Sequence, residues 1–137
     1  HSLRIAHGCI IGSDLAALLR FYGEGFGMRQ VFRFLRAGKE IGFYLDAGAG
    51  TFLEFFETAN ARPATPAPLD HLCLEVESVA GSAAHLRALG YTVTGEKMGA
   101  DRSWQAWVTD PAGTRVELHE YTDQSSQRTG RDCEVDW

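Results

Sequence analysis

The sequence has no excess of positive charge, no long hydrophobic run and few cysteines. Lysine and arginine total 13 against 18 aspartate and glutamate residues, so the formal net charge is −5. This balance excludes nucleic acid as an expected partner, because phosphate binding needs clustered basic side chains. No run of about 18 apolar residues is present, so no membrane span is expected. The 3 cysteines form no regular disulfide pattern and no secretion signal is visible, which predicts a cytoplasmic protein with reduced thiols.

The chain has an ordinary globular composition, with 45% hydrophobic residues, and its first part is predicted to be one module over residues 3–57. Ser13-Asp14 is a helix N-cap signal, and Gly23, Gly25 and Gly27 are expected to close that helix. The predicted strands are 4–11, 28–35, 40–46 and 51–56. The proline-containing stretch 58–68 is predicted to be a linker.

Residues 69–121 are predicted to be a second module with the same order of elements. Its helix is expected to begin after Ser78 and to end at Gly90. Its predicted strands are 69–76, 91–94, 104–109 and 114–121, and residues 122–137 form a C-terminal tail. The fold class is therefore α+β, with two βαβββ modules in one domain.

A histidine and a glutamate recur at matched spacing in the two modules. Glu54 follows His7 by 47 positions, and Glu117 follows His71 by 46. One such pair has an ordinary explanation, since a strand histidine is commonly structural and a strand glutamate commonly faces solvent. Two pairs in register favour a duplicated half of a four-ligand site. Two imidazoles and two carboxylates suit a divalent transition metal with open positions for substrate.

Side chains alternate between the two faces of a strand, so some further residues are predicted to share a face with the four candidate ligands. Cys9 shares a face with His7, and Cys73 shares one with His71. Both cysteines are expected to be small buried hydrophobic residues. His119 shares the face of Glu117 and is expected to be an ordinary residue or to line the cavity. Aromatic residues on the strands are candidates for cavity walls or for plain core: Phe43, Phe52, Phe56, Trp104, Trp107 and Tyr121.

Three segments together resemble the vicinal oxygen chelate superfamily, which includes glyoxalase I, methylmalonyl-CoA epimerase, extradiol dioxygenases and the fosfomycin and bleomycin resistance proteins. They are Leu69-Asp70-His71-Leu72-Cys73-Leu74-Glu75-Val76, the stretch from Asp110-Pro111-Ala112-Gly113 to Glu117-Leu118, and Phe21-Tyr22 with Phe26-Gly27-Met28. The resemblance covers nearly the whole chain. It implies one divalent ion (Ni, Co, Mn, Zn, Mg or Fe) bound by His7, Glu54, His71 and Glu117.

The resemblance further implies a metal-dependent lyase or isomerase that moves a proton next to a metal-chelated carbonyl. Glu117 or Glu54 is the expected base, and the expected substrate is a small molecule with vicinal oxygens. The alternatives are an antibiotic-binding resistance protein and an Fe(II) extradiol-type dioxygenase. Ile11 stands where glutathione-using relatives carry arginine, so little activity with glutathione is expected. A homodimer is expected because open sheets leave edges and apolar faces for a partner to cover.

Overall fold

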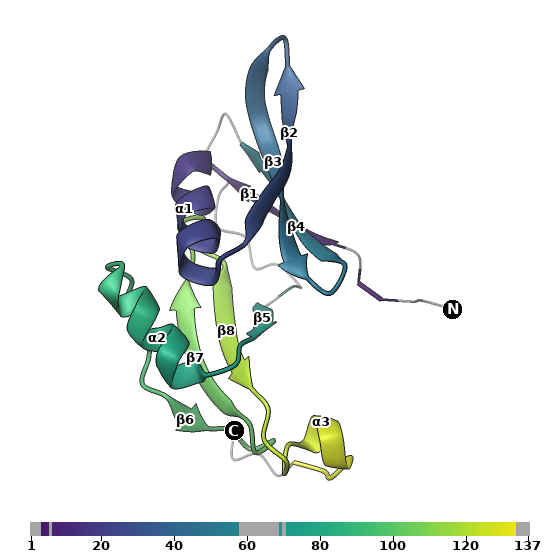
Figure 1. Cartoon of the computed structure of the whole chain (residues 1–137), viewed down its shortest axis with the longest axis vertical. Helices are drawn as coiled ribbons and strands as arrows, with labels where there is room; N and C mark the ends of the chain where they lie inside the picture. The colour runs from purple at the N-terminus through teal and green to yellow at the C-terminus, as the bar shows by residue number, and fades with distance from the viewer. Residues whose placement is uncertain (1–3, 6, 58–68, 70, 134–137) are drawn as a thin grey trace. The chain divides into compact units, whose positions relative to one another are not determined.

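The computed structural model describes residues 4, 5, 7–57, 69 and 71–133, which form two four-stranded sheets with one long helix each (Figure 1). The chain divides into two compact units. Unit 1 comprises residues 1–68 and 110–113, and unit 2 comprises residues 69–109 and 114–137. Each unit follows the order βαβββ, which confirms the predicted α+β repeat. None of the helices in these described ranges is long and apolar enough to cross a membrane.

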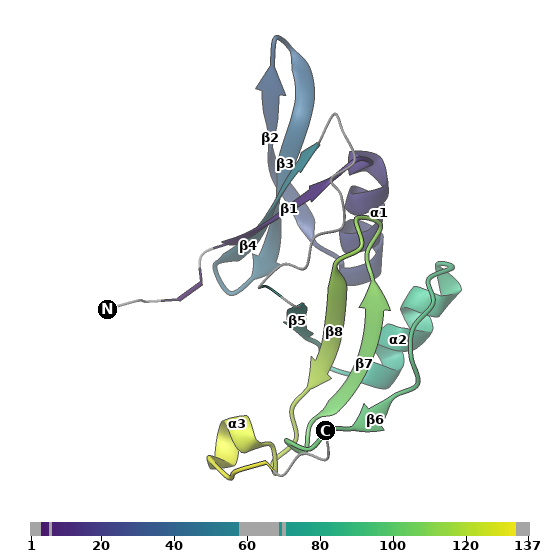
Figure 2. The same cartoon turned by 180° about the vertical axis from the view of Figure 1, so that it is seen from behind.

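In unit 1 the sheet has the strand order β1-β4-β3-β2. Strand β1 runs parallel to β4, and the other neighbours are antiparallel; Figure 2 shows β1 and β4 from behind. The elements are β1 (His7–Gly12), α1 (Leu15–Phe26), β2 (Arg29–Arg36), β3 (Lys39–Gly48) and β4 (Thr51–Glu57). The first and last strands of the module, β1 and β4, are therefore neighbours. This pairing is needed if His7 and Glu54 are to lie on one face of the sheet.

Helix α1 covers one face of this sheet. Its N-cap is Asp14, whose side chain accepts a hydrogen bond from the Ala17 amide at 3.0 Å, as the sequence predicted. The helix ends at Gly27, which adopts a left-handed φ of 68° that favours glycine. The prediction that Gly23 and Gly25 also close the helix was wrong, because both lie inside α1.

The core of unit 1 lies between α1 and this covered face of the sheet. The buried aromatic rings of Tyr22 and Phe55 lie 5.2 Å apart, and Phe43 stacks on Phe55 at 4.8 Å. Phe43 is therefore part of the core of unit 1. Among the described residues of unit 1, α1 is the one helix, so the side chains that alternate to the other face of the sheet have no helix over them there.

In unit 2 the sheet repeats this arrangement with the order β5-β8-β7-β6, in which β5 runs parallel to β8. The elements are β5 (Leu72–Glu75), α2 (Val79–Ala88), β6 (Lys97–Met98), β7 (Trp104–Thr109) and β8 (Arg115–Glu120). Ser78 caps α2 through a bond from the Gly81 amide, and the Glu120 carboxylate accepts a bond from the Val79 amide at 2.8 Å. The Ser78 cap is local, whereas the Val79–Glu120 bond fixes the start of the helix on strand β8.

The predicted strand 91–94 was wrong. Only Val93 forms a bridge, to Val108, and the second strand of the module is β6 (Lys97–Met98). The reason lies at Thr94, whose hydroxyl accepts the Trp107 amide at 2.8 Å and so replaces a regular backbone partner. The tail forms a short helix, α3 (Ser126–Thr129), and the predicted linker 58–68 lies outside the described residues.

Candidate functional site

In unit 1 the helix-free face of the sheet carries His7 and Glu54. Cys9 lies directly across from Glu54 in the β1–β4 register, and His7 lies across from Phe52. The alternation of strand side chains therefore places His7, Cys9 and Glu54 on one face, as predicted. His7 is exposed, and its ring lies 5.6 Å from that of Tyr44.

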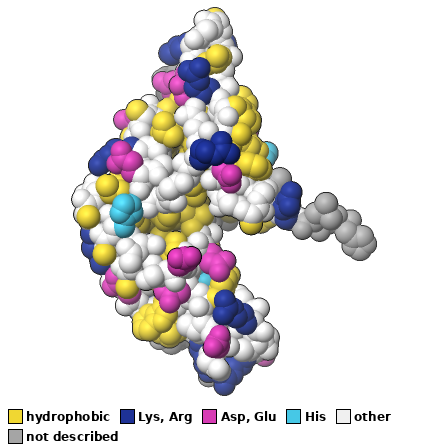
Figure 3. All heavy atoms as spheres, viewed as in Figure 1, with side chains coloured by type: hydrophobic (Ala, Val, Ile, Leu, Met, Phe, Trp, Pro, Cys, Tyr) yellow, Lys and Arg dark blue, Asp and Glu magenta, His cyan; other side chains and the backbone are white. Residues whose placement is uncertain are grey.

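Aromatic rings cover much of this same face. Phe32 stacks on Tyr44 with centroids 4.7 Å apart and an interplanar angle of 16°. Phe34 and Phe56 lie 4.6 Å apart, and Tyr44 and Phe52 lie 5.2 Å apart. Phe32 is 45% exposed, and Figure 3 shows hydrophobic side chains gathered on the surface of this unit. The surroundings of His7 and Glu54 are therefore apolar and aromatic.

In unit 2 the second histidine and glutamate lie close together. His71 Nε2 is 3.4 Å from Glu117 Oε2, and Cys73 lies directly across from Glu117 in the β5–β8 register. The Glu117 side chain is only 11% exposed, so its carboxylate is held mostly away from water. A buried carboxylate needs partners or a bound cation to offset the loss of hydration.

His119 supplies the second partner of Glu117. Its Nδ1 lies 2.8 Å from Glu117 Oε1, and its Nε2 lies 3.3 Å from Asp101 Oδ2. Asp101 is itself held by the Ser103 amide and by Gln127 Nε2. His119 is only 6% exposed, and its contacts place it beside Glu117 on the same face of the sheet. The sequence signal was its strand parity with Glu117, whereas nothing in the sequence pointed to Asp101.

Cys9 and Cys73 differ from their predicted role as buried hydrophobic residues, because both are exposed and neither forms a disulfide. The thiol of Cys73 is nevertheless partly shielded. This shielding, followed by the negative charges of Glu117, Asp101 and Glu75, raises its pKa to about 12. Without a cation nearby, Cys73 is therefore a neutral thiol at physiological pH.

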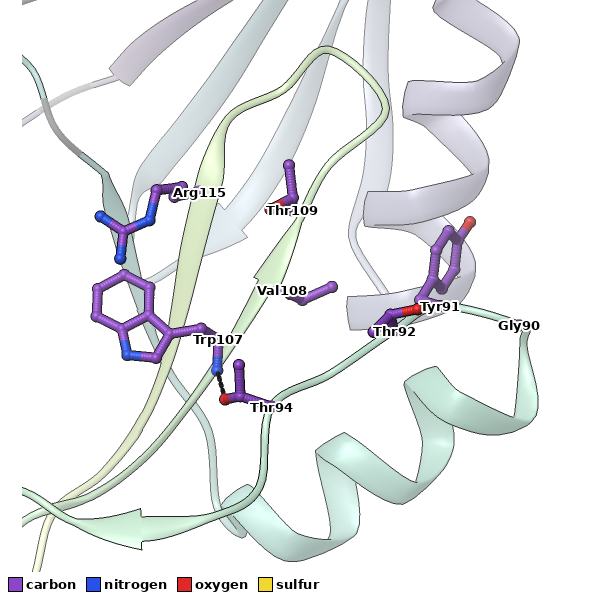
Figure 4. A pocket seen from close by; sticks show the side chains of 8 residues that line it. All are labelled: Gly90, Tyr91, Thr92, Thr94, Trp107, Val108, Thr109 and Arg115. Atoms are coloured by element: carbon purple, nitrogen blue, oxygen red, sulfur yellow. Dashed lines mark hydrogen bonds between the residues drawn. The ribbon is translucent and has the colours of Figure 1, made fainter.

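A pocket of about 620 Å³ in unit 2 lies between the loop after α2 and strands β7 and β8. Figure 4 shows Arg115 next to the indole ring of Trp107, and the guanidinium carbon is 4.4 Å from the ring centroid. The edge of the same indole meets His71, with ring centroids 4.8 Å apart. Trp107 therefore connects this pocket to the His71–Glu117 pair, and Arg115 gives the pocket a positive charge.

The donors on these two sheet faces fit a divalent transition metal. Each unit provides an imidazole and a carboxylate on one face, and such N and O donors suit ions of the zinc, nickel and cobalt type. In unit 2 a further group of three possible ligands, Cys73, Glu117 and His119, has its donor atoms within 4.8 Å of one another. The fold and these donors define a two-module protein with a candidate metal centre.

The comparisons with known proteins agree with the two-module fold. Residues 4–118 match the model of the Glyoxalase/Bleomycin resistance protein/Dioxygenase superfamily, and the chain belongs to this family. A glyoxalase family protein from Enterococcus faecalis is 29% identical with a TM-score of 0.72, over 86% of this chain and 98% of that one. No curated protein matches the sequence.

Two more distant structures share the fold. Lactoylglutathione lyase from Agrobacterium tumefaciens is 22% identical with a TM-score of 0.66, over 87% of this chain and 94% of that one. TnmS3, an antibiotic binding protein from Streptomyces sp. CB03234, is 23% identical with a TM-score of 0.71, over 89% and 100%. Enzymes and binding proteins thus share this architecture, so function must be argued from the site.

Proposed function

We propose that this protein is a metal-dependent lyase or isomerase that acts on a small substrate with vicinal oxygens. The observation that carries the proposal is the in-register repeat, in which each sheet presents one histidine and one glutamate on one face. His7, Glu54, His71 and Glu117 are the proposed ligands of one divalent ion. Such an ion supplies Lewis acidity toward a carbonyl oxygen of the substrate.

The residues of the chain would bind and deprotonate the substrate. Glu117 or Glu54 is the proposed general base, because a carboxylate beside the reacting carbon accepts the transferred proton. The Glu117 carboxylate is held from both sides, by His71 and by His119, which fixes its orientation. The aromatic face of unit 1 would exclude water from the apolar part of the substrate.

Loss of a proposed ligand is expected to lower the affinity for Co²⁺ or Ni²⁺. We expect Glu54→Gln and His71→Ala each to weaken binding by more than the roughly 10–100-fold that loss of an outer-sphere partner costs. Equilibrium dialysis with metal analysis would measure the change. Glu57→Gln is the matched control for Glu54→Gln, since Glu57 is exposed at the end of the same strand. Unchanged affinity in both ligand variants would refute the assignment.

Activity with glutathione is expected to be weak. Ile11 is 36% exposed and lies across from Phe56 on the face that carries His7. An apolar residue there leaves a glutathione carboxylate without a charge-assisted hydrogen bond, worth about 1.5–3 kcal/mol. That loss corresponds to a roughly tenfold to hundredfold weaker complex. Methylglyoxal plus glutathione would be assayed with the metal-loaded protein, and kcat/KM near 10⁶ M⁻¹s⁻¹, within the usual range of about 10⁴–10⁸, would contradict this expectation.

The second candidate function is the binding of an aromatic small molecule without turnover. The stacked rings of Phe32 and Tyr44 and the exposure of this face favour it, because planar ligands stack on such rings. Profiling on hemithioacetals, acyl-CoA epimers and catechols separates the two candidates, and oxygen uptake on catechols would reveal a dioxygenase. Product formation supports the enzyme, whereas saturable binding of an aromatic compound with no product supports the binding protein.

A homodimer is part of the proposal. The exposed apolar side chains of Val31 and Leu35 lie on β2, the edge strand of the unit 1 sheet, where a partner can cover them. Sedimentation velocity at micromolar concentration is expected to show a species of twice the 15.1 kDa chain mass. A single species at the chain mass would argue against this part of the proposal.

A further inference from the structure

The unit 2 sheet holds a second group of metal-ligand side chains that the proposed four-ligand set does not use. Cys73, Glu117 and His119 present one sulfur, one oxygen and one nitrogen donor within 4.8 Å of one another. Donors bound to one tetrahedral zinc-type ion at bond lengths of about 2.0–2.3 Å lie roughly 3.3–3.7 Å apart. Small side-chain movements therefore bring all three into coordination distance.

We propose that Cys73, Glu117 and His119 form a cation site within unit 2 that needs no ligand from unit 1. Glu117 is common to this site and to the four-ligand set, through different oxygens. Its Oε2 faces His71, and its Oε1 faces His119. A carboxylate can bridge two ion positions in this way, and paired sites with such bridges are a known arrangement in metalloenzymes.

The surroundings of His119 support the assignment. Its buried Nε2 has no hydrogen-bond partner among the described residues, although Asp101 Oδ2 is only 3.3 Å away. Nε2 lies on the Asp101 side of the ring, so the Nδ1 side, next to Glu117 Oε1, is the one that can bind an ion. An ion bound at Nδ1 would leave the Nε2 proton directed at Asp101, which is the carboxylate–histidine–metal arrangement typical of protein metal sites.

Comparison of the two sheets shows that the third ligand is confined to unit 2. Cys9 faces Glu54 in unit 1 as Cys73 faces Glu117 in unit 2. Two positions after Glu54, however, the chain carries Phe56, where unit 2 carries His119. The equivalent place in unit 1 therefore offers an aromatic ring and no nitrogen donor.

The donor set and the local charge indicate which ion this site would take. The carboxylates of Glu117, Asp101 and Glu75 lie close enough to Cys73 for their charges to act on its thiol, so acidic groups surround this ligand. Thiolate and imidazole ligands favour Zn²⁺ and Co²⁺, whereas Mg²⁺ and Ca²⁺ prefer oxygen donors alone. We therefore assign the site to a borderline transition metal.

Titration of the full-length protein with Co²⁺ tests this assignment, because a cobalt–thiolate bond gives a charge-transfer band in the near ultraviolet. We expect the band in the unmodified protein and its loss in Cys73→Ser. Cys9→Ser is the matched control and should keep the band, because Cys9 faces a glutamate in the same register. His119→Gln should weaken Co²⁺ binding by about tenfold or more, with unchanged circular dichroism showing that the fold is intact.

The same titration in Glu54→Gln separates this inference from the proposed function. The band should persist there, because unit 2 supplies all three ligands. Cobalt binding without a thiolate band in the unmodified protein would overturn the unit 2 site and leave the four-ligand proposal standing. A band of equal strength in Cys73→Ser would overturn it as well. Unchanged cobalt affinity in Glu54→Gln and His7→Ala would count against the four-ligand set alone.

Discussion

Replacing Phe55 with alanine is expected to lower the free energy of unfolding by about 3–5 kcal/mol. Phe55 is fully buried on the covered face of the unit 1 sheet, where its ring contacts Phe43 at 4.8 Å and Tyr22 at 5.2 Å. Alanine removes these contacts and leaves a cavity that a close-packed core refills only in part. The free energy of unfolding of a domain of this size is commonly about 5–15 kcal/mol, so the variant would lose a large share of its stability.

Phe32→Ala is the matched control for this prediction, since Phe32 lies on the opposite, helix-free face and is 45% exposed. Its stacking on Tyr44 is worth about 1 kcal/mol, so a small loss is expected. Urea unfolding of both variants would give the comparison. Similar losses for Phe55→Ala and Phe32→Ala would mean that the core does not lie between α1 and the sheet.

The stability of the protein is expected to fall steeply above about pH 10 because of Tyr22. Burial is the main cause that raises the pKa of Tyr22 far above its ordinary value, and the adjacent Asp110, which accepts its hydroxyl at 2.8 Å, raises it further. In the unfolded chain the phenol ionises near pH 10, while in the folded chain it stays protonated. The stabilisation is therefore complete below about pH 10 and is lost as pH rises, by up to about 1.4 kcal/mol per unit.

Urea unfolding would measure this loss between about pH 8 and pH 12, a range that spans the ordinary tyrosine pKa of about 10. Tyr22→Phe should remove most of the slope, since phenylalanine has no proton to release in the unfolded state. The same variant should be less stable near neutral pH, because the buried Asp110 carboxylate loses one hydrogen-bond donor. The raised pKa of Cys73 acts in the same direction, so some alkaline loss should remain. An identical slope in Tyr22→Phe would show that Tyr22 is not the cause.

The repeat could be predicted from the sequence because its signals are local. Asp14 and Ser78 cap helices in equivalent places, and both caps are present in the structure. In the structure the first and last strands of each module are neighbours, which is what lets the His and Glu of each pair share a face. Turn and helix-end residues were less informative, since Gly23 and Gly25 are tolerated inside α1.

The parts that the sequence did not predict depend on contacts between distant residues. Residues 91–94 alternate like a strand, but the Thr94 hydroxyl takes the Trp107 amide, and regular pairing begins only at Lys97. Asp101 lies in a loop 18 positions before His119, and only the folded chain brings their side chains together. A pattern of strand parity can indicate which residues share a face, but it cannot indicate which loop residue reaches them.

The position of Trp107 has a consequence for spectroscopy. Residues 1–68 contain no tryptophan, whereas Trp104 and Trp107 both lie on β7 of unit 2, so their indole fluorescence reports on that unit. The indole of Trp107 meets the His71 ring at 4.8 Å. A paramagnetic ion bound at His71 is therefore expected to quench this emission directly. Trp107 would therefore serve as an optical probe of the proposed metal site, while unit 1 contributes no indole emission.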